Sequence, residues 1–204
     1  SALLQDESLV ESILRAVTKS VEIPVTLKIR TGWNPGNRNG VRIARIAEES
    51  GVKALAVHGR TRECMFRGVA EYETIREIKA AVSIPVFANG DIDTVEKAQE
   101  VLLHTGADAI MLGRGALGRP WIFAAINHAL ANSPQEQLDT NQTVSLTAVR
   151  DIMLYHLEAL YRLYGQDRGV RIGRKHLTWY CKYLDGAAEF RDNFVKIENA
   201  ADQM

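Results

Sequence analysis

The sequence predicts an α/β fold in which the second half of a (β/α)8 barrel is followed by a small all-helical domain. Four apolar segments each run into a polar turn, and they begin about 30 residues apart with a helical pattern in every gap. From about residue 144 to the end, the apolar spacing is helical throughout. Because a closed barrel of this kind contains eight strand–helix units, four units correspond to half of one.

The four predicted strand segments cover residues 25–30, 54–60, 85–91 and 109–115, with the sequences VTLKIR, ALAVHGR, PVFANGD and AIMLGRG. Each segment is mostly apolar rather than alternating, which is typical of parallel strands. Helices are expected over residues 1–21, 41–47, 71–82 and 94–105, and a fifth one after Pro120. Asp93 or Thr94 can cap the start of the fourth helix, and Gly106 can end it.

These elements predict two domains joined by a linker. The partial barrel would cover residues 1–131, and the polar stretch NSPQEQLDTNQT at 132–143 would form the linker. The helical domain would cover residues 144–204, with helices at 144–164, 169–184 and 187–202. A half barrel has two unpaired sheet edges, so we expect either a fragment or a chain that self-associates through its open barrel.

Composition excludes several protein classes. The chain has 46% hydrophobic and 25% charged residues and a formal net charge of zero, as in ordinary globular proteins. Two cysteines in 204 residues do not make a disulfide framework and favour a reducing compartment. No apolar run approaches the ~20 residues that span a bilayer, and the N-terminus carries no basic signal region. We therefore expect a cytoplasmic protein with no membrane contact.

Glycine-containing turns follow the last two predicted strands. Residues 89–91 read NGD and residues 113–115 read GRG. In a (β/α) barrel, such paired turns form a phosphate site, where backbone N–H groups and a helix N-terminus face the anion. Arg114 can add a charge-assisted contact. The alternative interpretation is that the glycines only make tight turns.

Cationic and titratable side chains meet near the predicted mouth of the barrel. Lys28 and Arg30 lie two residues apart on one strand, so they share a face and need anionic or electron-rich partners. His58 ends the next strand, which favours a functional role. The alternatives are structural salt bridges for the cations and a structural role for the histidine.

A basic stripe without acidic residues lies in the helical region. It comprises Arg168, Arg171, Arg174, Lys175, His176 and Lys182, with Trp179, Tyr180 and Tyr183 nearby. Such a stripe is typical of nucleic-acid backbone binding, and the alternative is a solvated helix face. The sequence shows no metal-ligand spacing and no P-loop, and GRGALG at 113–118 matches a dinucleotide motif weakly. Cys64 has cationic neighbours but no identified base, which favours a structural thiol.

Taken together, VTLKIRTGW, HGRTRECMF, PVFANGDI, LGRGALGRPWIF and RIGRKHLTWY resemble the bacterial tRNA-dihydrouridine synthases, particularly the B-type branch. The resemblance covers nearly the whole chain. It implies an FMN-binding barrel followed by a helical tRNA-binding domain, which reduces uridines of tRNA to 5,6-dihydrouridine. NADPH or NADH would be the reductant for the FMN, and no metal is implied.

The resemblance also implies roles for individual residues. Lys28 and His58 would contact the flavin ring, and Arg30 and His58 would be the catalytic residues present near the ring and the base. The remaining assignments follow the motifs: Asn89, Gly90, Asp91, Gly113 and Arg114 would hold the ribityl-phosphate arm, and Arg171, Arg174, Lys175 and His176 would lie along the tRNA.

One part of the family pattern is missing from this sequence. The family's proton donor is a cysteine in an N-x-G-C-P loop upstream of the residues present, and neither Cys64 nor Cys181 lies in such a context. We therefore expect the chain alone to lack synthase activity. Two other functions stay open: another FMN barrel reducing a free pyrimidine, such as a dihydroorotate or dihydropyrimidine dehydrogenase, and a non-catalytic RNA-binding fragment.

Overall fold

The structure is a computed structural model that describes residues 2–131, 144–182 and 184–204. It divides into two compact units, Ser1–Gly115 and Ala116–Met204. The division therefore falls before helix α5 (Ile122–Ala131), whereas the sequence-based division grouped everything up to residue 131 with the barrel. The expected linker at 132–143 lies outside the described residues.

The first unit contains a parallel four-stranded sheet, which confirms the predicted α/β arrangement. Its strands are β1 (Thr26–Arg30), β2 (Ala54–His58), β3 (Val86–Asn89) and β4 (Ala109–Met111), in the order β1-β2-β3-β4. Every strand lies inside its predicted segment. All but β1 stop short of the predicted end, because the polar and glycine residues there form the turns.

A helix precedes or follows each strand of this sheet. They are the 3-10 helix η1 (Ala2–Gln5) and the helices α1 (Glu7–Ser20), α2 (Gly40–Glu49), α3 (Glu73–Ala81) and α4 (Val95–Thr105). The helix predicted over residues 1–21 is divided, because the Asp6 carboxylate accepts the Leu9 amide N–H at 2.9 Å and caps α1. Thr94 caps α4 and Gly106 ends it in the left-handed region, both as predicted.

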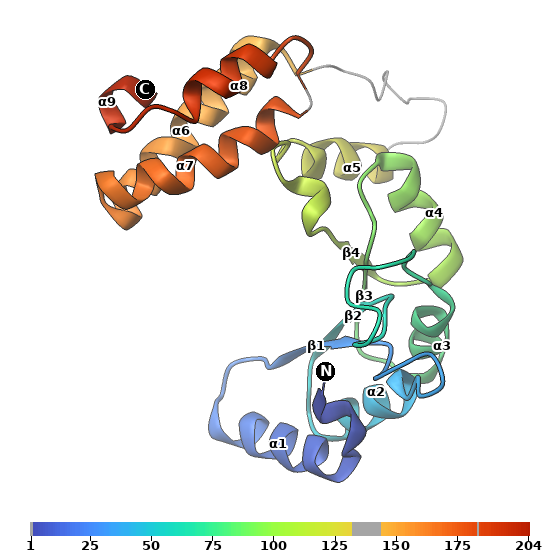
Figure 1. The fold of residues 1–204 in the computed structure, drawn as a ribbon. Coiled ribbons are helices and arrows are strands. Elements are labelled where there is room, and N and C mark those ends of the chain that lie inside the picture. The colour runs from blue at the N-terminus through green and yellow to red at the C-terminus, as the bar shows by residue number, and fades with distance from the viewer. Residues whose placement is uncertain (1, 132–143, 183) are drawn as a thin grey trace. The chain divides into compact units, whose positions relative to one another are not determined.

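The two faces of the sheet have different surroundings. Helices α2, α3 and α4 lie along one side of the strands (Figure 1), and Leu55, Val57 and Val86 on that face are fully buried. In the parallel register, Thr26, Lys28 and Arg30 share the opposite face with Ala56, His58, Phe87 and Asn89. Within the described part of the first unit, no helix covers this opposite face, which we call the helix-free face.

The regular elements described in the second unit are all helical. Besides α5, they are α6 (Leu146–Tyr164), α7 (Gln166–Cys181), α8 (Ala188–Phe194) and α9 (Ala200–Gln203), shown in orange to red in Figure 1. Leu157, Leu177, Cys181 and Phe194 form a buried cluster between them. Gly173 permits the close approach of α7 to α6, since a Cβ there would lie 2.8 Å from Leu157 Cδ2.

Two helix predictions in this unit need correction. Helix α7 begins at Gln166 rather than at residue 169, directly after Gly165 with φ of 76°. The single helix predicted over 187–202 is wrong, because it is divided into α8 and α9. Asn199 Oδ1 accepts the Asp202 amide N–H at 2.9 Å and starts the second of them. None of the described helices is long and apolar enough to cross a membrane.

Candidate functional site

The strand register brings the predicted site residues together on the helix-free face. In the strand register, Arg30 lies beside His58, His58 beside Asn89, and Asn89 beside Met111. These residues therefore form one row at the carboxyl ends of the strands. Lys28 lies on the same face as Arg30, two residues before it, as the two-residue period of a strand predicts. Parallel strands thus gather residues that are far apart in the sequence.

Asn89 connects three strands through its side-chain amide. Lys28 Nζ donates to Asn89 Oδ1 at 3.0 Å, and Asn89 Nδ2 donates to the Met111 carbonyl at 2.7 Å. Partial burial, followed by the charge of Arg30, lowers the pKa of Lys28. The Lys28 side chain therefore has an amide partner rather than a carboxylate, and it lies on the open side of the sheet.

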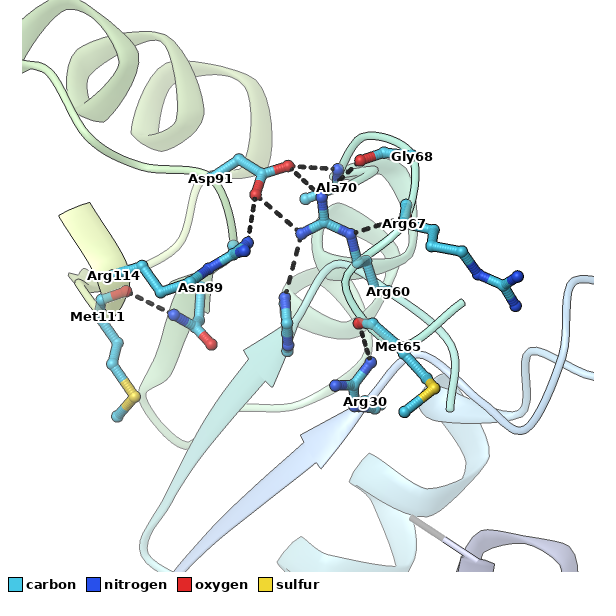
Figure 2. Close-up of polar contacts among 12 residues, drawn as sticks. Arg30, Arg60, Met65, Arg67, Gly68, Ala70, Asn89, Asp91, Met111 and Arg114 are labelled. Atoms are coloured by element: carbon cyan, nitrogen blue, oxygen red, sulfur yellow. Dashed lines mark hydrogen bonds and ion pairs between the residues drawn. The ribbon is translucent and has the colours of Figure 1, made fainter. Parts of the chain in front are cut away.

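Arg30 is held by the loop that follows β2. Its Nη1 donates to the carbonyl oxygen of Met65 (Figure 2) and to that of Thr61, each at 2.8 Å. Its guanidinium lies 5.7 Å from the centre of the Phe66 ring. No described residue forms an ion pair with Lys28 or Arg30. The alternative of structural salt bridges therefore finds no support in the described part of the chain.

His58 is buried at the centre of the row. Loss of solvation lowers its pKa, and the charges of Arg30, Lys28 and Arg60 lower it further, to about 4. The imidazole is therefore neutral around pH 7. A neutral ring can donate one hydrogen bond and accept another, which suits contact with an uncharged heterocycle.

The sequence analysis missed Arg60, whose side chain is only 3% exposed. Its guanidinium makes two hydrogen bonds to the Asp91 carboxylate, at 2.8 and 2.6 Å, and others to the carbonyls of Arg67 and Gly68 (Figure 2). Arg60 thus fastens the loop after β2 to the turn after β3. Its position directly after His58 and Gly59 at the end of a strand was the available signal.

The two glycine turns lie against each other, as the phosphate-site hypothesis requires. Gly90 has φ of 123° and Asp91 has φ of 50°, so the turn after β3 is left-handed at both residues. A Cβ on Gly115 would lie 2.5 Å from the Ile92 carbonyl oxygen. Only a glycine permits this approach of the two turns. The residues after Gly113 form the short 3-10 helix η2 (Arg114–Ala116) rather than the start of a long helix.

Asp91 organises these turns instead of leaving its carboxylate open. It accepts hydrogen bonds from Arg60, from the Ala70 amide N–H at 2.9 Å and from Arg114 Nη2 at 3.4 Å. Burial alone would raise the pKa of Asp91, but the hydrogen bonds from Arg60 and Ala70 lower it. Arg114 also lies 4.7 Å from the centre of the Phe66 ring, so Asp91 and Phe66 together place its guanidinium.

The basic stripe lies on α7 except for Lys182, which directly follows the helix, and its members have different surroundings. Arg171 and Lys175 are exposed, and Lys175 Nζ lies 5.2 Å from the Trp179 ring centre. Arg174 donates two hydrogen bonds to the Ile197 carbonyl, at 3.1 and 2.7 Å. His176 packs between the rings of His156 and Trp179, with ring centres 4.5 and 5.0 Å away.

The remaining candidates for metal or thiol chemistry are the histidine, acidic and cysteine side chains. The described residues contain no group of three or more His, Cys, Asp or Glu that could hold a metal ion. The Thr61 hydroxyl donates to Cys64 Sγ at 3.0 Å, and Cys181 is buried in the helical core. These surroundings agree with the interpretation of Cys64 as a structural thiol.

Comparison with known proteins gives one consistent result. The dihydrouridine synthase (Dus) family model matches residues 1–204. The tRNA-dihydrouridine synthase B of Pseudomonas aeruginosa is 55% identical over 199 residues, which are 98% of this chain and 58% of the relative. That of Shewanella oneidensis is 54% identical over 203 residues, 100% of this chain and 61% of the relative. The chain thus spans about 60% of the length of the curated relatives it matches.

Proposed function

The chain belongs to the dihydrouridine synthase family, and on this premise we propose that it serves the flavin-dependent reduction of uridine to 5,6-dihydrouridine in tRNA. Relatives at about 55% identity are tRNA-dihydrouridine synthases B. The observation that carries the proposal is the row of Arg30, His58 and Asn89 on the helix-free face, next to two interlocked glycine turns.

We propose that the sheet is half of a (β/α)8 barrel and that its helix-free face lines the interior. All four strands are parallel, their helices lie on one side, and the site residues lie at the carboxyl ends, where barrel enzymes place their chemistry. The preceding strands would come from the part of the relatives that this chain does not span. The remaining residues, from 144 onward, would be the helical tRNA-binding domain.

The donor set fits FMN with NADPH or NADH as the reductant. Lys28 and the neutral ring of His58 offer hydrogen-bond donors to a heterocycle, and Asn89 orients Lys28. Gly90, Gly113 and the Arg114 guanidinium would hold the phosphate arm, with Asp91 acting through Arg114 rather than directly. A Cβ on Gly113 would meet nothing within 4 Å, which leaves its backbone open to a ligand. When bound, FMN supplies the electrons for reduction of the base.

We assign the catalytic roles on this chain to Arg30 and His58. During reduction of the uracil ring, negative charge develops at the C4 carbonyl oxygen, and fixed cations or hydrogen-bond donors stabilise it. Arg30 is held in place by two carbonyls and a ring, so its position costs no reorganisation when that charge develops. The proton for C5 would come from the family's cysteine loop, which this sequence lacks, so we expect no turnover by this chain alone.

The tRNA would bind along α7. Among the family-matched residues, Arg171 and Lys175 are the exposed ones and would contact phosphates. Arg174 and His176 would act by holding Ile197 and Trp179 in place. With tRNA as the substrate, a cytoplasmic location follows, and the open edges of the half barrel are the basis for expecting self-association.

An FMN titration of the purified chain tests the cofactor site. We expect quenching of flavin fluorescence that saturates near one FMN per chain. Lys28→Met would weaken binding roughly tenfold or more, because a charge-assisted hydrogen bond is lost. Lys79→Met is the matched control, since it removes an ion pair with Asp108 away from the helix-free face. Absence of saturable binding, or equal weakening by both variants, would contradict the assignment.

A flavin barrel that reduces a free pyrimidine is the competing enzyme, and an RNA-binding fragment is the competing binding protein. The exposed cations of α7 favour a polyanionic substrate over a free base. To distinguish the tRNA-reducing enzyme from the enzyme that reduces a free pyrimidine, the barrel segment that precedes this chain in its relatives is added in trans, and activity on tRNA is compared with activity on free uracil. FMN binding distinguishes both enzymes from a non-catalytic RNA-binding fragment.

A further inference from the structure

Four of the five N–H groups of the Arg60 guanidinium donate to oxygen acceptors. Nε donates to the Arg67 carbonyl at 3.2 Å, and Nη2 donates to the Gly68 carbonyl and to Asp91 Oδ2, both at 2.6 Å. Nη1 donates to Asp91 Oδ1 at 2.8 Å, and it also lies 3.5 Å from Nε2 of His58. The fifth N–H therefore faces the histidine ring.

The contact between Arg60 and His58 fixes which ring nitrogen carries the proton. A guanidinium has no acceptor and stays protonated in proteins, so a nitrogen that faces it must present a lone pair. Nε2 of His58 is therefore the unprotonated nitrogen, and Nδ1 carries the hydrogen. The other tautomer would place two N–H groups against each other in a buried position.

Gly90 holds the same edge of the ring. A Cβ on Gly90 would lie 2.9 Å from Cδ2 and 3.3 Å from Nε2 of His58, so this edge packs directly against the turn after β3. Nδ1 lies on the other side of the ring and has no hydrogen-bond partner among the described residues. The ring is thus clamped by one edge, and its N–H group is the one left for a ligand.

We propose that Arg60 is a positioning residue that holds His58 in the neutral Nδ1–H form, so that His58 offers its ligand a hydrogen-bond donor. The acceptor would be a carbonyl oxygen or ring nitrogen of a heterocycle on the helix-free face. The identity of that heterocycle, flavin or uracil, rests on the proposed function. The tautomer of the His58 imidazole does not depend on the proposed function.

The charges around the ring stabilise this form. Lys28 and Arg30 approach it from β1 and Arg60 from the loop after β2, while Asp91 in the turn after β3 is the one acidic group among its electrostatic neighbours. Three cations against one carboxylate disfavour an imidazolium, and burial adds to this, which agrees with a pKa of about 4. His58 therefore stabilises negative charge by hydrogen bonding and does not supply a proton itself.

Long-range 1H–15N correlation spectra of the 15N-histidine-labelled chain test the inference directly. For His58 we expect one protonated nitrogen, Nδ1, and one unprotonated nitrogen, Nε2, from pH 8 down to about pH 5. His58→Gln identifies the signal. A proton on Nε2, or a ring that becomes doubly protonated near pH 6.5, would overturn the proposal.

Two variants separate positioning from general damage. In Arg60→Met, loss of the facing N–H and of one cation should admit the Nε2–H form and raise the His58 pKa. In Asp91→Asn, Arg60 keeps an acceptor, so the tautomer should persist while the His58 pKa falls, and Asn tolerates the positive φ. Lys79→Met should change neither. If the His58 pKa shifts in the same direction in Arg60→Met and in Asp91→Asn, the assignment is contradicted, even if one variant is less stable.

Addition of FMN tests the role toward the ligand. Saturating FMN should shift the Nδ1–H signal of His58 downfield, while the Nε2 signal stays unprotonated. Binding without any change at Nδ1 would overturn the donor role and leave the proposed cofactor intact. Failure of FMN to bind would contradict the proposed function, and the tautomer would still be decided by the spectra of the free chain.

Discussion

Three cations surround His58, and each is stabilised by a different kind of partner. Lys28 is bound by an amide, Arg30 by two carbonyls and Arg60 by a carboxylate. Only Arg60 has its charge neutralised by an acidic partner, so the helix-free face keeps a positive excess. An uncompensated charge near a partly buried site favours binding of an anion or of a group that becomes negative.

Gly90 combines a positive φ with close packing against His58, so we expect it to tolerate substitution poorly. Gly90→Ala places a methyl group at positive φ and within 2.9 Å of both His58 Cδ2 and Ala70 Cβ. We expect a loss of about 2–4 kcal/mol in unfolding free energy, from backbone strain and overpacking together. Urea denaturation measures the loss.

Gly106→Ala is the matched control for that substitution. Gly106 also has positive φ, but a Cβ there would meet nothing within 4 Å, so the cost should be strain alone, about 1 kcal/mol. The difference between the two variants measures the packing of Gly90 against His58 and Ala70, together with the difference in strain between φ of 123° and 64°. Equal losses would show that this packing contributes nothing.

The residue scale also shows where sequence reasoning stops. A strand places side chains two residues apart on one face, which was enough to group Lys28 with Arg30. Arg60 was missed because its acceptors, Arg67, Gly68 and Asp91, become its neighbours only when the loop folds back over β3. Asp91 was predicted to hold the cofactor, but its carboxylate is engaged by Arg60 and Arg114.

At the scale of elements, the strands were predictable because each is a mostly apolar segment that ends at a polar or glycine-containing turn. The division of the last helix was not predicted; in the segment between α8 and α9, the carbonyl of Ile197 accepts a hydrogen bond from Arg174 of another helix. Asn199 was the local signal, since Asn is a preferred N-cap residue, and the helical spacing of apolar residues concealed it.

Helix α7 should act as an electrostatic binding surface. Replacing Arg171 and Lys175 with Ala should weaken tRNA binding roughly tenfold and lower the slope of log affinity against log salt by about one per lost phosphate contact. Filter binding over a series of salt concentrations measures both quantities. FMN binding should be unchanged, since these residues lie in the other compact unit.

A charge-matched control separates local contacts from net charge. Arg150 and Arg191 also lie in the second unit, and each is paired with the adjacent Asp151 or Asp192. Their double Ala variant removes the same charge as the α7 variant but should leave the salt slope unchanged. If the two double variants behave alike, α7 is not the RNA-binding helix.

At the scale of the whole molecule, the first unit leaves apolar surface without a partner. Helix α1 packs Val10 and Leu14 inward, yet Leu9, Ile13 and Val17, on the adjoining part of the same apolar face, are about 40% exposed; we call these three residues the α1 stripe. Strand β1 beside it has only β2 as a neighbour in the described sheet. A surface helix normally buries its apolar face, so the exposed part of this face favours burial against another chain.

We therefore expect the chain to self-associate through the α1 stripe at micromolar concentration. Ile13→Lys with Val17→Lys should weaken association about tenfold or more, because each substitution removes the apolar surface that the contact would bury and adds like charge across it. The control pair, Leu103→Lys with Leu146→Lys, adds the same charge at exposed apolar positions on α4 and α6. Sedimentation velocity over a concentration series should show association in the wild type and the control only. Monomers throughout would show that the stripe stays exposed in solution, and equal weakening in both double variants would assign the effect to net charge.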